Sequence, residues 1–321
     1  QSGNGDVTTG GDVLVSAGTD WTMAGGTEIT ATGNVVGQAS SGDLTLGVIA
    51  GENVALTASG SIIDANAGLL NVTADSLSLR AGSGLIGNHD NANGTPGQNA
   101  NAIDIAVATL AADADSGIYV SETDSLTVTA IAEVAVDIES VVRVNFNSTT
   151  ADVSVDGSTA ALEDLSTESN GPIKLVVLAG SLTIDGGSSG PGVSANGSGD
   201  VLLEARGGDV NVNADVVSGT GNVTLEANND LSVNSAVATG GSGTIYVRSG
   251  NSTILADVLS SDGGGILIDS AANLTQAASI TSTSGDVGLI TGGTLNQSGN
   301  GDVTTGGDVL VSAGTDWTMA G

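Results

Sequence analysis

The stretch GDVLLEARGGDVNVNADVVSGTGNVTLEAN, residues 199–228, contains the pattern that decides the fold. Short runs of alternating aliphatic residues begin at Val201 and again at Val223, and Gly, Asp or Asn precedes each run. Such alternation is typical of β-strands that bury one side, and the bounding residues favour tight turns. The first aliphatic residues of successive strands are separated by 22, 22, 21, 21 and 22 residues, at Val201, Val223, Ile245, Ile266, Val287 and Val309. This interval predicts one coil of a solenoid.

Each interval divides into three parts at polar corner residues. The three sets of corners are Asp200, Asn222, Thr244, Gly265, Asp286 and Asp308, then Asp209, Asp230, Thr253, Asn273, Thr294 and Asp316, then Asp215, Ala236, Asp257, Ser279 and Asp302. Three corners imply three strands. We therefore predict an all-β fold, a right-handed parallel β-helix (β-solenoid) with three strands per coil of about 21–22 residues.

Alternation also assigns the inward side chains, because successive residues of a strand point to opposite sides. The second strand is predicted to send inward Val210, Leu231, Ile254, Leu274, Leu295 and Trp317, followed by Val212, Val233, Ala256, Gln276, Gln297 and Met319. The two stacked Gln residues are expected to bond along the axis through their amides. The outward ladder carries Leu202, Tyr246, Leu267 and Leu310, which could support lateral association or ligand contact.

The sequence of residues 1–25 occurs again, without a change, at residues 297–321. We interpret residues 1–296 as one complete solenoid unit, and residues 297–321 as the start of the next identical unit in the same continuous solenoid. Extending the first-strand register backwards through Val13, Val35, Val54 and Leu77, with recovery near Leu175, gives about 13 coils per unit. At the spacing of β-strands the unit would rise roughly 60 Å, and Trp317 would occupy the slot of Trp21. Register slips near Pro96, Pro172 and Pro191 predict excursions from the corners.

Composition restricts the function. The chain has five basic and 36 acidic residues, giving a net charge of -31, so nucleic acid and anionic membranes are unfavourable partners and cations are favourable ones. Without cysteine, disulfides and zinc–thiolate sites are excluded. No apolar run reaches membrane-spanning length and no signal peptide is visible, so targeting segments are expected to lie outside these residues.

Catalytic signals are weak, and we expect no enzymatic activity and no required cofactor. The basic residues Arg80, Arg143, Lys174, Arg206 and Arg248 are scattered, whereas a polysaccharide-cleaving β-helix needs clustered acids and bases. Arg248 is expected to pair with Glu226 or Asp269 on adjacent coils. The loop containing His89 matches a calcium loop only in part, and an exposed loop is the favoured interpretation.

Stacked corner acids are the candidate metal ligands. Asp286 and Asp308, and likewise Asp209 and Asp230, should lie one coil apart, where like charges repel unless they are screened. One hypothesis is that Ca²⁺ or another divalent cation bridges them. Simple capping of the turns is the alternative, and we favour it.

The run GENVALTASGSIIDANAGLLNVTADSLSLRAGSGLIGN, residues 51–88, continues to AIDIAVATLAADADSGIYVSETDSLTV and resembles the repeats of giant bacterial filamentous-haemagglutinin-like surface proteins. Residues 12–130 carry the resemblance best, and residues 131–172 match poorly. The resemblance implies an exported, extracellular or cell-surface rod for adhesion or cell contact, with neighbouring identical units as partners and a receptor that the sequence does not identify. Two alternatives stay open, namely a polysaccharide-binding or depolymerising β-helix and a calcium-dependent sheath component.

Overall fold

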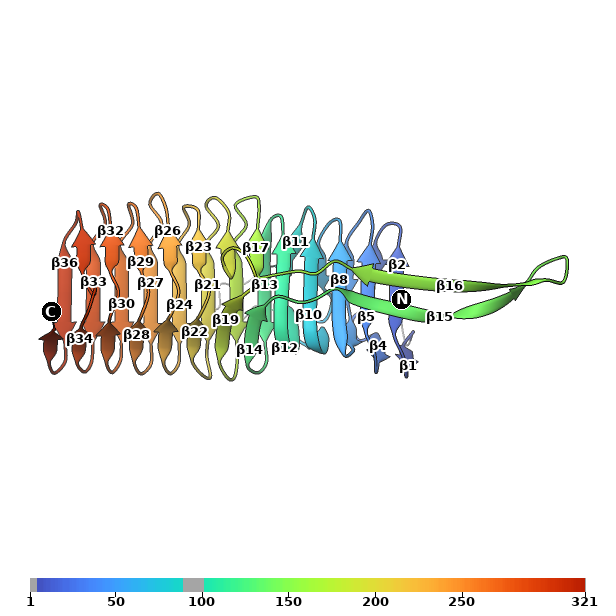
Figure 1. Cartoon of the computed structure of the whole chain (residues 1–321), viewed down its shortest axis with the longest axis horizontal. Helices are drawn as coiled ribbons and strands as arrows, with labels where there is room; N and C mark the ends of the chain where they lie inside the picture. Colours follow the sequence, from blue (N-terminus) through green and yellow to red (C-terminus); the bar gives the residue numbers. More distant parts are fainter. Residues whose placement is uncertain (1–4, 89–100, 321) are drawn as a thin grey trace.

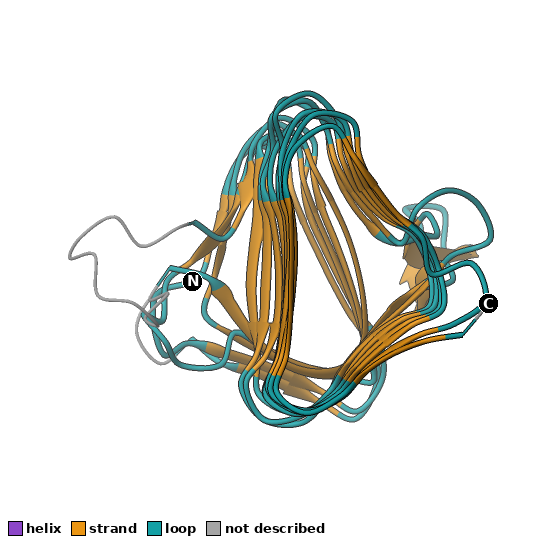
Figure 2. Ribbon diagram, turned by 90° about the vertical axis from the view of Figure 1, so that its left-hand side faces the viewer, coloured by secondary structure: helices purple, strands orange, loops and turns teal. Residues whose placement is uncertain are grey.

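The computed structural model describes residues 5–88 and 101–320, and within these residues it contains strands and no helix. Successive coils stack along one axis and each contributes three parallel strands, so the cross-section is triangular (Figures 1 and 2). The predicted all-β parallel solenoid with three strands per coil is confirmed. No helix in the described ranges is long and apolar enough to cross a membrane.

The strands form three faces, which we call faces I, II and III in the order in which the chain visits them. Face I consists, up to the level of β12, of β1 (Val7–Thr9), β4 (Glu28–Ala31), β7 (Val48–Ala50), the first part of β10 (Val72–Ala81) and the first part of β12 (Ile103–Ala114), and beyond that level of β14 (Leu126–Thr129), β19 (Leu182–Gly186), β22 (Val210–Val212), β25 (Leu231–Val233), β28 (Thr253–Leu255), β31 (Leu274–Gln276), β34 (Leu295–Gln297) and β37 (Trp317–Met319). The boundary between the faces shifts at β12, because its first part pairs with β13, whereas β14 pairs with Thr109 and Leu110 in its second part. Face II consists of β2 (Val13–Ala17), β5 (Val35–Ala39), β8 (Asn53–Ala58), the second parts of β10 and β12, β17 (Leu165–Thr167), β20 (Val193–Ala195), β23 (Val216–Ser218), β26 (Val237–Thr239), β29 (Leu259–Ser261), β32 (Ile280–Ser282) and β35 (Val303–Thr305). Face III consists of β3 (Trp21–Thr22), β6 (Leu44–Leu46), β9 (Ile62–Asp64), β11 (Leu85–Ile86), β13 (Gly117–Glu122), β18 (Ile173–Val177), β21 (Val201–Ala205), β24 (Val223–Ala227), β27 (Ile245–Ser249), β30 (Ile266–Ser270), β33 (Val287–Thr291) and β36 (Val309–Ala313).

One antiparallel hairpin leaves the stack. Its strands are β15 (Val134–Val144) and β16 (Thr150–Thr159), and it runs along the solenoid axis past the first coil (Figure 1). Its base buries Val134 and Val136 against Val36 and Ala55 of face II. The hairpin lies within residues 131–172, the segment that fits the coil pattern poorly. It contains no proline, so the largest described excursion is not one of those that the prolines predicted.

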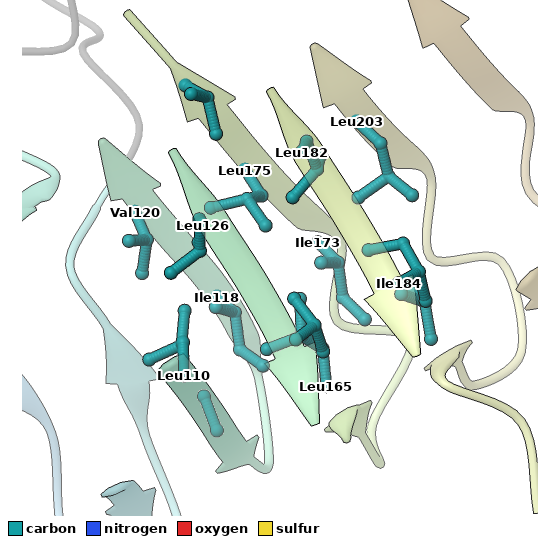
Figure 3. Packing of buried hydrophobic residues seen from close by; sticks show 14 of the residues in the cluster. Leu110, Ile118, Val120, Leu126, Leu165, Ile173, Leu175, Leu182, Ile184 and Leu203 are labelled. Carbon is teal, nitrogen blue, oxygen red and sulfur yellow. The ribbon is translucent and has the colours of Figure 1, made fainter. Parts of the chain in front are cut away.

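The interior is a continuous stack of aliphatic side chains that extends along the rod from Val13 to Leu295. Figure 3 shows it beside the insertion of the hairpin, where Leu126, Leu165 and Leu182 from three strands belong to the same cluster of buried side chains. Like residues stack on like residues because parallel strands in register place equivalent positions one coil apart. This repetition explains how the stack continues across the insertion without a break in the core.

Two details of the second-strand ladder differ from the sequence expectation. Thr253, not Ile254, pairs with Leu231 and is fully buried, whereas Ile254 is 46% exposed. Leu255 then takes the inward position that was assigned to Ala256. The buried Thr253 hydroxyl is satisfied because it bonds to the Ser249 hydroxyl at 2.8 Å, and the larger Leu255 fills the core.

The stacked glutamines behave as predicted. Gln297 donates from Nε2 to Oε1 of Gln276 at 3.0 Å, and Gln276 is fully buried. Trp317 extends the chain of bonds by donating from Nε1 to Oε1 of Gln297 at 2.6 Å. The amides therefore form an axial network inside the core.

A single ladder of paired residues joins the two copies of the repeated segment. It runs on face III through Trp21, Leu44, Ile62, Ile86, Ile118, Ile173, Val201, Val223, Ile245, Ile266, Val287 and Val309. These 12 positions are separated by 11 coils. Because Val309 is the copy of Val13, which precedes Trp21 by one strand, 296 residues advance the chain by 11 coils and one further strand.

This result corrects three sequence expectations. The ladder of Val13, Val35, Val54 and Leu77 lies on face II, whereas Leu175 and Val201 lie on face III. Trp317 pairs with Leu295 on face I and does not occupy the face of Trp21. The unit has fewer coils than about 13, because two of its coils are long: Ile86 and Ile118 are paired one coil apart at a separation of 32 residues, and Ile118 and Ile173 at a separation of 55 residues. Its rise is therefore roughly 54 Å.

Candidate functional site

The corner aspartates cap the turns of the following coil. Asp286 accepts a hydrogen bond at Oδ1 from the Asp308 amide at 2.8 Å, and Asp209 accepts one from the Asp230 amide at 3.1 Å. Asp230 in turn accepts from the Ser252 amide at 2.9 Å and from Asn251 Nδ2 at 2.7 Å. Each capping carboxylate therefore satisfies a backbone donor that the tight turn leaves free.

The predicted cation ligands are brought together only in pairs. Asp209 and Asp230 lie at the start of face I strands, and Asp286 and Asp308 at the start of face III strands. Within residues 5–88 and 101–320 no group of three or more His, Cys, Asp or Glu side chains could hold a metal ion. Bridging by a divalent cation stays a prediction. The partial calcium-loop match at His89, Asn91, Asn93 and Gly94 lies outside the described residues.

The basic residues are spread along the rod. Arg206 forms an ion pair with Glu204, with 2.8 Å between Nε and Oε1, and Arg80 approaches Asp113 at 3.5 Å. Arg248 stands in register between Glu226 and Asp269 on the outward side of face III, as the sequence indicated. Arg206 and Arg248 line one small pocket of about 170 Å³ together with Glu204 and Glu226, on the three successive coils of β21, β24 and β27.

Two carboxyl groups have strongly raised pKa values, the buried Glu122 and the half-buried Asp104. Glu122 on β13 is fully buried and accepts hydrogen bonds from the Val107 and Asp124 amides, both at 3.0 Å. Burial raises the pKa of Glu122 from 4.5 to about 7, against the lowering effect of these backbone hydrogen bonds. Burial also raises the pKa of Asp104 from 3.8 to about 6. Since the Glu122 side chain has no exposed surface, its described position fits a structural role better than contact with a substrate.

A shallow apolar groove follows the outward side of face III near the last described coils. It has a volume of about 570 Å³ and crosses β27, β30, β33 and β36. The outward ladder at its floor runs Tyr246, Leu267, Gly288, Leu310, as the alternation predicted. Leu267 is 37% and Leu310 56% exposed. Leu267 leans over Gly288, where an added Cβ would lie 2.7 Å from Leu267 Cδ1.

The distal part of the hairpin is a second apolar surface. Val153 and Val155 on β16 are 39% and 53% exposed, and Val142 and Val144 on β15 are 62% and 71% exposed. Phe146 at the tip has no cover at all. Several exposed aliphatic residues on one arm are more than isolated surface residues and indicate a contact surface.

Sequence reasoning found the groove residues but missed the hairpin. The signal that could have found it is the alternation of Val with polar residues on both sides of the turn sequence NFNSTT, residues 145–150, which is typical of an antiparallel pair. The outward ladder of the groove was predicted from the sequence, but the position of Gly288 between Leu267 and Leu310 on this ladder is known only from the paired strands.

Comparison with known proteins gives no relative: no family model, no curated protein and no solved structure matches this chain.

Proposed function

We propose that residues 1–296 are a structural repeat of a long extracellular or cell-surface fibre of the adhesin type. The observation that carries the proposal is the unbroken ladder from Trp21 to Val309, which places the second copy of the repeated segment in the same stack as the first. A further copy would therefore lengthen the rod instead of adding a separate domain. Stability in such a rod is a sum of contacts between neighbouring coils, so length scales with the number of units.

The two copies of the repeated segment show how much apolar surface a covering coil buries. Val13 is 8% exposed and Met23 is fully buried, whereas the identical copies Val309 and Met319 are 51% and 71% exposed. The coils that stack on Val13 and Met23 therefore bury side chains that are exposed where no coil covers them. Burial of this apolar surface favours tandem units as the first partners of the chain.

The remaining features fit a surface fibre. The resemblance of residues 12–130 to filamentous-haemagglutinin-like repeats supports an exported protein that mediates attachment, cell contact or matrix formation. The net charge of -31 keeps rods apart in solution and disfavours nucleic acid. Divalent cations such as Ca²⁺ would screen this negative charge and promote lateral self-association.

The test is a two-copy protein, in which residues 1–296 are joined directly to residues 1–321, compared with the single chain by small-angle X-ray scattering. We expect the longest dimension to increase by roughly 54 Å with an unchanged cross-section. Two compact bodies at variable separation would refute the proposal. Turnover of any member of a glycan panel would instead establish the polysaccharide-cleaving alternative.

A further inference from the structure

We propose that the apolar groove on face III binds the β15–β16 hairpin of the following copy of the unit. This inference rests on the tandem arrangement proposed above and names the contact that fastens consecutive units. Its parts are the groove floor, the distal hairpin and the duplicated segment of the sequence.

The groove contains copies of residues that already touch the hairpin in the first coil. In the first coil, the Asp137 amide lies 3.5 Å from Asp12 Oδ2, and Leu14 packs against the cluster at the hairpin base. Asp308 and Leu310 are the copies of Asp12 and Leu14, and both line the groove. In the following unit, the hairpin would make these same contacts with Asp308 and Leu310.

The phase of the repeat places the hairpin of the following unit on the face that carries the groove. Because 296 residues advance the chain by 11 coils and one strand, the hairpin that covers face II in one copy covers face III in the next. The groove lies on face III, on the coils that end at β36. Without this offset, the following hairpin would lie over a different face.

Direction and length agree with this arrangement. The hairpin runs along the axis beyond the first coil, toward the position of a preceding unit (Figure 1). From Asp156, beside Asp137, β16 continues six residues to Thr150, which is a reach of roughly 20 Å. The groove extends three coils from β36 to β27, or roughly 14 Å. The hairpin is long enough to cover all of it.

The side of the hairpin that would face the groove is apolar. Gly157 faces the solenoid, since a Cβ there would lie 2.7 Å from Leu14 Cδ1. Val155 and Val153 lie two and four residues farther along the same strand and therefore point to the same side. They fall roughly 7 and 14 Å beyond Gly157, near the levels of Gly288 and Tyr246. Because Leu267 leans over Gly288, the Val155 side chain would pack against Leu267 at this level.

The test uses the two-copy protein, which has no natural cysteine. Leu267→Cys is placed in the first copy and Val155→Cys in the second, and a short bismaleimide reagent is added. The matched control replaces Val155→Cys by Asp156→Cys, the neighbouring exposed residue on the opposite side of the strand. We expect the Leu267–Val155 pair to cross-link at least about tenfold faster than the control.

Equal rates for both pairs, or no cross-link, in a protein that has the doubled rod length would overturn the hairpin contact and leave the fibre intact. A protein without the doubled length would remove both proposals. A second measurement guards against distortion by the cysteines. In the two-copy protein with Val153→Asp and Val155→Asp only in the second copy, amide exchange of β27 and β30 in the first copy should rise severalfold. Unchanged exchange in these strands would also contradict the contact.

Discussion

Replacing Glu122 by Gln should change how the stability of the solenoid depends on pH. The folded-state pKa of Glu122, about 7, is higher than its usual value of 4.5, so the folded chain holds this proton more tightly than the unfolded chain. The stabilisation is fully present below pH 4.5 and is lost as the pH rises through about 7. The difference between the folded-state pKa and the usual pKa of Glu122 corresponds to at most about 3 kcal/mol of unfolding free energy.

The Gln variant should lack this loss. Its amide group can accept a hydrogen bond from only one of the Val107 and Asp124 amides, which costs about 1 kcal/mol at every pH. We therefore expect Glu122→Gln to be less stable than the parent by about 1 kcal/mol at pH 5 and more stable by up to about 2 kcal/mol at pH 9.

Urea unfolding followed by circular dichroism at pH 5, 7 and 9 measures the difference. Glu133→Gln removes one exposed carboxyl and controls for the change in net charge. The half-buried Asp104 is present in all three proteins, so its titration cancels in the comparison. Parallel pH profiles for the parent and Glu122→Gln would refute the argument that Glu122 is buried with a raised pKa.

Three other changes test the packing and the corners. Gly37→Ala should destabilise the chain by about 1–3 kcal/mol in thermal unfolding, because the new Cβ would lie 2.4 Å from Trp21 Cζ3. Gly10→Ala is the control, since a Cβ there has no neighbour within 4 Å and should have little effect; equal melting temperatures for the two variants would contradict this packing. Acrylamide should quench Trp317, which is 51% exposed, more strongly than Trp21, which is 7% exposed, when each is studied with the other replaced by Phe. In the two-copy protein the tryptophan at the position of Trp317 is Trp21 of the second copy, and it should be as protected as Trp21 of the first copy; continued strong quenching there would argue against a continuous stack. The melting temperature should be the same in excess calcium and in chelator, because the corner aspartates already accept backbone hydrogen bonds; a clear rise with calcium would establish cation bridging at Asp209 and Asp230 or at Asp286 and Asp308.

The regular coils could be predicted from sequence because their periodicity has one physical cause. Parallel strands in register stack equivalent residues, so Val201, Val223 and Ile245 repeat at the length of a coil. The glutamine pair was predictable for the same reason. Ile254 was misassigned because a shift of one residue along a strand exchanges all inward and outward side chains. Only the structure shows that Thr253 can be buried at the inward position, because its hydroxyl bonds to the Ser249 hydroxyl.

The phase of the repeat could not be obtained by counting residues. Three coils from Val13 to Leu77 were counted correctly, but β10 and β12 pass through a corner and the hairpin leaves the stack altogether. The three faces carry the same alternating pattern, so the sequence does not distinguish face II from face III. The candidate groove follows from that phase. Only the paired strands reveal that Leu310 lies on face III, whereas the hairpin of this chain packs on face II.

Electron cryo-microscopy of the two-copy protein tests the central claim most directly, because the hairpin marks one position in each unit. We expect the two hairpins to lie roughly 54 Å apart along the axis and on adjacent faces of the triangular rod. Two hairpins on the same face would mean that a unit contains a whole number of coils, and would contradict both the phase of the repeat and the contact built on it.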